Sequence, residues 1–238
     1  LGSDRISKMK TLIPLLILVG TTGLAQGQAP LKKDDGKHLF ILSGQSNMSG
    51  LKPEVSFTPK VNAAFGENNV IVIKFAAFGQ PIRMWYKNWK PEEGRPIIAP
   101  GGRKDKYPIG GVYERMIKAV KKKIEGQKIR TVNFLWMQGE GDIRGGHSKV
   151  YADSFKGLMK QLEEDLKYKN IKFVIGRISD YGLNRRGADE SQSEHWKAIR
   201  KAQVDLAENS PYGDWIDCDT FNNVGRKERI HYTKEGYG

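Results

Sequence analysis

Four short polar motifs in this sequence carry residue types that could together hydrolyse an ester. They are a serine in "GQSNM" (44–48), a turn glycine in "AFGQPI" (77–82), a glutamine with two carboxylates in "QGEGD" (138–142) and a histidine in "ERIH" (228–231). Acyl transfer needs a nucleophile, donors for the oxyanion of the tetrahedral intermediate, and a base oriented by an acid. The motifs supply each of these groups and therefore predict an ester hydrolase.

The motifs follow apolar segments that are typical of buried strands. Five such segments, rich in Val, Ile and Phe, lie at 38–43, 69–76, 131–137, 171–179 and 215–219. They are apolar on both faces, as in strands that are covered on both sides. Amphipathic stretches between them predict helices at 111–126, 151–167 and 193–208.

This alternation indicates a three-layer α/β/α sandwich with a central five-stranded parallel sheet. In such sheets, ligands bind at the carboxyl ends of the strands. Since the four motifs follow strands, we expect them to meet at one site.

The four motifs resemble the sequence blocks of the SGNH hydrolase superfamily, within it the sialate O-acetylesterase-like and family 6 carbohydrate esterase branch. "GQSNMSG" looks like the nucleophile block, "AFGQPI" the glycine block, "WMQGEGD" the third block and "ERIH" the terminal Asp-x-x-His block. The resemblance covers about residues 37–238. It implies a flavodoxin-like SGNH fold and a serine esterase that removes O-acetyl groups from carbohydrates.

The resemblance also assigns roles to residues. Ser46 is expected to attack the acyl carbonyl, and His231 to take the proton of Ser46 and later give it to the leaving alcohol. The backbone N–H groups of Ser46 and Gly79 and the side-chain amide of Gln138 are expected to form the oxyanion hole, where losing one donor typically costs ~10²–10³ in rate. The alternative for Ser46, a plain helix N-cap, leaves the companion motifs unexplained.

Two carboxylates compete for the role of orienting His231. Glu228 stands where the family usually has aspartate, and a glutamate can still accept from the imidazole N–H. Glu140 is the alternative acid, or a support for Gln138. We favour Glu228.

Four further residues are predicted to contact the substrate: Gln45, Asn47, Trp85 and Arg185. An aromatic face can stack on a sugar ring and an arginine suits carboxylate or sulfate groups. Core packing is an equal alternative for Trp85, and a solvated loop is the alternative for Arg185. No metal or other cofactor is predicted, since the sequence contains no His-Glu-x-x-His or paired-cysteine motif.

The N-terminal segment reads as an export signal. An apolar run with small residues before a cut near Gly27 predicts a signal peptide at 9–27. Residues 1–8 are expected to precede the native start, and 28–238 to form one SGNH-type domain that is secreted or periplasmic, in a bacterium. The sequence ends seven residues after His231, where family members continue into a closing helix, so we expect the domain to lack that helix.

The net charge bears on which classes of partner are expected. The net charge of +13 favours acidic partners, and an exported protein meets acidic polysaccharide more often than nucleic acid. Simple solubility is the alternative explanation. The expected substrate is an acetylated carbohydrate that can also carry acidic groups: a polysaccharide or O-acetyl sialic acid. A non-catalytic glycan-binding module and a lipid or thioester hydrolase remain as alternatives; no nucleic acid and no stable membrane insertion are expected.

Overall fold

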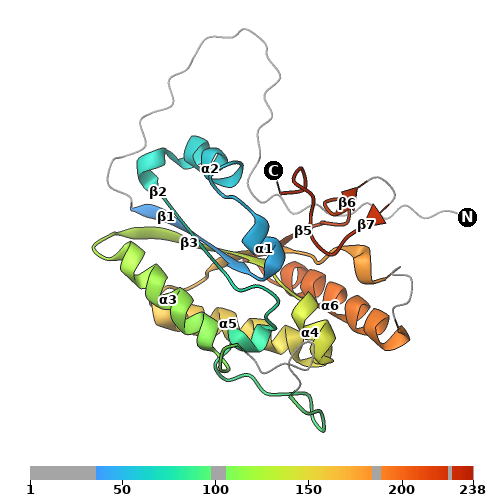
Figure 1. Cartoon of the computed structure of the whole chain (residues 1–238). Helices are drawn as coiled ribbons and strands as arrows, with labels where there is room; N and C mark the ends of the chain where they lie inside the picture. The colour runs from blue at the N-terminus through green and yellow to red at the C-terminus, as the bar shows by residue number, and fades with distance from the viewer. Residues whose placement is uncertain (1–35, 98–105, 184–188, 225–226, 238) are drawn as a thin grey trace, which may run out of the picture. The chain divides into compact units, whose positions relative to one another are not determined.

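The first strand of the chain lies near the centre of a five-stranded parallel sheet (Figure 1). The strand order is β2-β1-β3-β4-β5. The bounds are β1 Lys37–Gly44, β2 Val70–Ala76, β3 Ile129–Met137, β4 Lys172–Gly176 and β5 Gly213–Ile216. All five predicted strands and the parallel sheet are thus confirmed.

The structure, a computed structural model, describes residues 36–97, 106–183, 189–224 and 227–237, without the side chains of 223–228. The predicted signal peptide at 9–27, residues 1–8 and Arg185 lie outside the described residues. The backbone of Glu228 is described, but its side chain is not. Within the described ranges, no helix is long and apolar enough to cross a membrane.

Helices cover both faces of the sheet, which confirms the three-layer sandwich (Figure 1). Alternate residues of β1 supply the two cores: Leu39 and Ile41 join the larger one, whereas Phe40 and Leu42 join the smaller one. The larger core is covered by α3 Gly111–Ile124, α5 Tyr151–Leu166 and α6 Glu190–Glu208, and the smaller one by α1 Ser46–Gly50 and α2 Phe57–Phe65.

The strand order places a topological switch point beside β1. The chain passes from β1 to β2 on one side, then crosses to β3 on the other side of β1. Right-handed crossovers in opposite directions must lie on opposite faces, so the carboxyl ends of β1 and β3 are where this type of sheet is expected to bind a ligand. Gly44 pairs with Ala76 on one side and Met137 on the other, so these three strands end level.

Several short elements were not predicted. They are α2, α4 Glu140–Gly145, the 3₁₀ turns η1 Glu67–Asn69, η2 Ile82–Met84, η4 Ser148–Val150 and η5 Asp180–Gly182, and the hairpin strands β6 Asn223–Val224 and β7 Lys227–Glu228. Most are too short to show a helical or strand period. The fourth strand ends earlier than predicted because the Ile178 N–H donates to the Gln203 side chain instead of a neighbouring strand.

Candidate active site

The first motif forms the turn between β1 and α1, and Ser46 is the first residue of that helix. The turn is fixed by a hydrogen bond of 2.9 Å from the Gln45 N–H to the Met137 carbonyl. A Cβ at Gly44 would collide with the same Met137 carbonyl, so only glycine fits before the turn. The Ser46 N–H heads α1 and finds no acceptor among the described residues, which leaves it available to a ligand.

The second motif supplies a further open N–H group one strand away. The Ala77 N–H donates to the Gly44 carbonyl at 2.9 Å, so the glycine turn starts level with the serine turn. Gly79 has φ +68°, and nothing lies within 4 Å of where its Cβ would be. No described group accepts a hydrogen bond from its N–H. The Gly79 N–H thus has no partner among the described residues, as is required of a donor that is to bind an oxyanion.

The Gln138 side chain does not show the open geometry expected of an oxyanion donor. It is fully buried, and its Nε2 faces Asp142 Oδ2 at 2.5 Å, the Gln80 carbonyl at 3.2 Å and Gln45 Oε1 at 3.4 Å. An amide has two N–H groups, so an oxyanion would have to displace one of these acceptors. In this structure Gln138 braces the turns around Ser46 and Gly79.

Asn47 ties the nucleophile turn to the segment that carries His231. Its Nδ2 donates to Glu140 Oε1 at 3.0 Å and to the Ile230 carbonyl at 3.1 Å. Its Oδ1 accepts from the Tyr232 N–H at 3.2 Å and from the Tyr237 hydroxyl at 3.1 Å. We call these four bonds the Asn47 clamp, and two of them hold the residues on both sides of His231. They also occupy this buried side chain, which was predicted to contact substrate.

His231 lies beside the glycine turn. Its ring centroid is 5.6 Å from that of Phe78, with the ring planes tilted by 46°. Although the residue as a whole is exposed, partial desolvation of the ring and then the charge of Arg144 lower the pKa of His231 below its ordinary value. The imidazole is therefore neutral at neutral pH, which is the form that can act as a base.

Neither predicted acid is seen to orient His231. The side chain of Glu228 lies outside the described atoms, and no described group hydrogen-bonds the His231 ring. Glu140 is buried and accepts from Asn47, so it reaches the His231 segment through the clamp. Burial raises the pKa of Glu140, and it raises the pKa of Asp142 to about 7.

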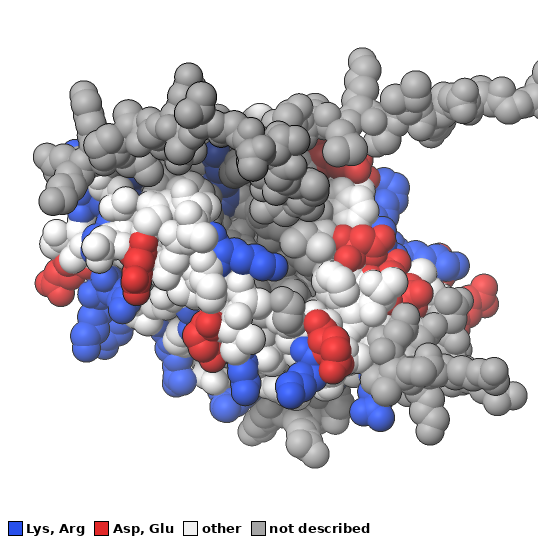
Figure 2. Space-filling view, turned by 90° about the horizontal axis from the view of Figure 1, so that it is seen from above, with Lys and Arg blue, Asp and Glu red and all other residues white. Residues whose placement is uncertain are grey.

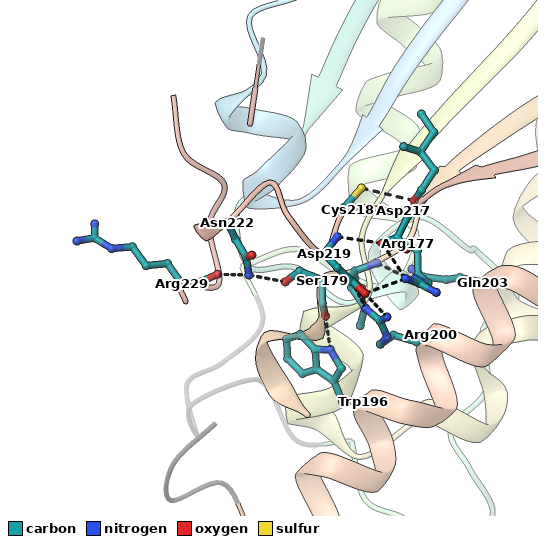
Figure 3. Close-up of polar contacts among 12 residues, drawn as sticks. Arg177, Ser179, Trp196, Arg200, Gln203, Asp217, Cys218, Asp219, Asn222 and Arg229 are labelled. Atoms are coloured by element: carbon teal, nitrogen blue, oxygen red, sulfur yellow. Dashed lines mark hydrogen bonds and ion pairs between the residues drawn. The ribbon is translucent and has the colours of Figure 1, made fainter. Parts of the chain in front are cut away.

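A second polar cluster, which the sequence did not reveal, fixes the chain between β5 and His231 (Figure 3). Asp219 accepts two hydrogen bonds from Arg200, at 2.6 and 2.8 Å, and one from Arg177 at 2.9 Å. Asn222 donates from its side chain to Ser179 Oγ at 2.9 Å and to the Arg229 carbonyl at 2.7 Å. The hairpin before His231 is thereby joined to the end of β4.

Two of the remaining predicted contacts are internal. Trp85 has no exposed surface; its Nε1 donates to Ser43 Oγ at 3.0 Å and its ring meets that of Trp136 edge-on, so it is a core residue with no face for a sugar. Gln45 is buried and accepts from the Gly141 N–H at 3.0 Å.

Two exposed residues that act on His231 were missed: Phe78, whose ring lies next to the imidazole, and Arg144, whose charge lowers the pKa of His231. A sequence signal existed for Phe78, which directly precedes the turn glycine.

The high net charge is not gathered into one surface on the face seen in Figure 2. There Lys and Arg side chains are interspersed with Asp and Glu. The charge that contributes to lowering the pKa of His231 is the local one of Arg144. Among the side chains that the structure describes, no group of three or more His, Cys, Asp or Glu residues is arranged to hold a metal ion.

Comparisons with solved structures show what the fold resembles. A search of curated proteins found no match. Among solved structures, a protein from Arabidopsis thaliana matches with a TM-score of 0.60 and 17% identity, over 85% of this chain and 93% of that one. A carbohydrate acetylesterase from Xanthomonas citri matches with a TM-score of 0.57 and 14% identity, over 84% of this chain but only 53% of that one. At such identities the likeness shows the fold.

The sequence profile of a family described as "Carbohydrate esterase, sialic acid-specific acetylesterase" matches residues 49–237. The match begins just after the turn that holds Ser46 and includes the glycine turn, the third motif and the His231 segment. Since it spans most of the sequence, this chain belongs to the sialic acid-specific acetylesterase family of carbohydrate esterases.

Proposed function

We propose that this protein is a serine esterase that removes O-acetyl groups from carbohydrates. The observation that carries the proposal is the Asn47 clamp. It joins the residue after Ser46 to both neighbours of His231, 183 and 185 positions away in the chain. Three of the four hydrogen bonds of the clamp, to Ile230, Tyr232 and Tyr237, link the turn of the proposed nucleophile to the segment of the proposed base, which supports the assignment.

The proposed reaction uses these groups in two steps. Ser46 Oγ attacks the acetyl carbonyl while neutral His231 takes its proton, and the N–H groups of Ser46 and Gly79 stabilise the oxyanion. Collapse of the intermediate breaks the ester bond, and His231 gives the proton to the departing sugar hydroxyl. A water molecule, activated by His231, then releases acetate from the Ser46 acyl-enzyme.

We further propose that Glu228 orients His231, whereas Glu140 acts through Asn47. Replacing a triad acid by its amide lowers kcat by roughly 10⁴-fold, because the histidine takes the wrong tautomer. Glu228→Gln should show a loss of this order. Glu140→Gln keeps an oxygen that can accept from Asn47, so its loss should be much smaller. The reverse ranking of the two variants would assign the acid role to Glu140.

The substrate class is tested by measuring acetate release from acetylxylan and from O-acetyl sialate. Wild type should release acetate from one of them, and Ser46→Ala, which removes only the hydroxyl oxygen, should abolish the release. Full activity in Ser46→Ala would refute the assignment. Glycan binding that survives Ser46→Ala, without acetate release from any glycan, would indicate a binding module instead. Rates that rise with acyl chain length would indicate a lipid or thioester hydrolase.

A further inference from the structure

Phe78 is an exposed aromatic residue at the centre of the proposed chemistry. Its exposed fraction is 67%, matched among the large apolar residues in the described part of the chain only by Val55. Its ring lies 5.6 Å from the His231 ring, centroid to centroid. It is bonded directly to Gly79, whose N–H has no hydrogen-bond acceptor among the described residues. Because burying a phenyl ring is favourable, its exposure here is not explained by folding.

The proposed reaction determines what must lie beside this ring. The carbonyl oxygen of the ester must come within about 3 Å of the Gly79 N–H. The leaving-group oxygen must come within hydrogen-bond reach of His231, about 2.6–3.2 Å. Phe78 adjoins both groups, one through the peptide bond and the other through the ring contact. The part of the substrate that departs with the leaving oxygen therefore passes over the exposed face of Phe78.

We propose that Phe78 is a stacking platform for the pyranose ring that carries the acetyl ester; this inference rests on the proposed function. A phenyl ring has no hydrogen-bonding group, so it offers only a flat apolar face. A sugar ring presents a matching face of C–H groups, whereas a small acyclic alcohol does not. Phe78 thereby selects acetyl esters of cyclic sugars over acetyl esters of small alcohols.

A second effect of Phe78, on the pKa of His231, can be separated from stacking. By covering one side of the imidazole it contributes to the desolvation that lowers the pKa of His231. Loss of that cover would change the hydrolysis of every acetyl ester by the same factor. Stacking, in contrast, changes the ratio of the rates for two esters that differ only in the alcohol.

The experiment compares xylose tetra-acetate, which has one pyranose ring, with ethyl acetate, which has none. The readout is kcat/KM for the sugar ester divided by kcat/KM for ethyl acetate. It is measured in wild type, Phe78→Ala, Phe78→Tyr and Phe78→Leu. Phe78→Ala should lower the ratio by about 10-fold, mainly through a higher KM for the sugar ester, as expected for a contact of about 1.4 kcal/mol. Phe78→Tyr should keep the wild-type ratio, and Phe78→Leu, which is apolar but not flat, should resemble Phe78→Ala.

The matched control is Tyr212→Ala, which removes an exposed aromatic residue from the amino end of β5, at the opposite edge of the sheet. It should leave the ratio unchanged. A ratio that is unchanged in Phe78→Ala, or lowered equally in the control, would overturn the stacking inference and leave the esterase assignment intact. If wild type hydrolyses neither ester nor any acetylated glycan, the proposed function is wrong and the inference falls with it.

Discussion

Asn47→Ala is the change that most directly tests how the site is assembled. The substitution removes the clamp and leaves three groups without that partner: Glu140 Oε1 and the Tyr232 N–H, which are buried, and the Ile230 carbonyl, which is partly buried. The Tyr237 hydroxyl can rotate to another acceptor, so it is not counted. His231 keeps its side chain but loses the restraint on the peptide groups at either side of it.

The size of the effect follows from these contacts. A buried polar group left unpaired costs about 1–3 kcal/mol. Water can enter the space left by the amide, so the lower end of that range applies to each of the three groups, and the free energy of unfolding should fall by about 3 kcal/mol. The variant should also lose activity while it is folded, because a displacement of about 1 Å in a catalytic group can cost ~10²-fold in rate. We expect kcat to fall by about this factor with little change in KM.

The assay is acetate release at a temperature where both variants and wild type are folded, with urea unfolding measured alongside. Asn222→Ala is the matched control, since it removes two hydrogen bonds of another buried asparagine, one to Ser179 after β4 and one to the Arg229 carbonyl, two residues before His231. It should cost about 2 kcal/mol of stability and lower kcat by less than about 5-fold. If Asn222→Ala lowers kcat as much as Asn47→Ala does, the loss reflects a loosened segment, and the clamp has no specific role in placing His231.

Three further predictions concern the neighbours of the clamp. Gly79→Ala should cost ~1–2 kcal/mol of stability and lower kcat by about 10–100-fold, because the strained turn shifts its N–H. Gly126→Ala is the control: Gly126 has the same φ of +68° and equally open space around its Cβ position, so the variant should lose the same stability without a change in kcat. Equal activities of the two variants would contradict the oxyanion role of Gly79. Arg144→Gln should raise the pKa of His231 and so move the acid limb of the pH profile of kcat/KM to higher pH, by less at high salt. Lys122→Gln, an exposed charge at the far end of α3, is its control, and an equal shift there would show a general charge effect. Burial raises the pKa of Asp142 to about 7, above the ~3.9 of an unfolded chain, so the folded state binds more protons between those values and this group makes stability fall as pH rises. Asp142→Asn should remove that contribution. The urea midpoint of the variant minus that of wild type should therefore increase as the pH is raised from 4.5 to 7. A difference that stays constant with pH would contradict the raised pKa.

The sheet could be predicted from the sequence because its signals are local. Each strand is a run of apolar residues that can only be buried on both faces, and α3, α5 and α6 show a clear helical period. The level ends of the strands then follow from parallel pairing, which is why the serine and glycine turns adjoin as expected. Helix α2 was missed because it has only nine residues, too few to show a clear helical period.

The roles of individual side chains in the site depended on contacts that no local pattern encodes. Trp85 and Phe78 are aromatic residues on either side of Gly79 in the sequence, yet Trp85 is enclosed by the core and Phe78 is exposed beside His231. Local sequence could not distinguish them, since burial is decided by β3 and by the C-terminal segment, which come much later in the chain.

Asn47 shows the same limit more sharply. Its position beside Ser46 suggested a contact with substrate, but its partners at Ile230 and Tyr232 are peptide groups, which every residue possesses. A side chain that binds backbone leaves no complementary residue type in the sequence to find. The link between the two ends of the chain, on which the proposed catalysis depends, is therefore visible only in three dimensions, and the Asn47 and Asn222 variants test whether that link is the one that places His231.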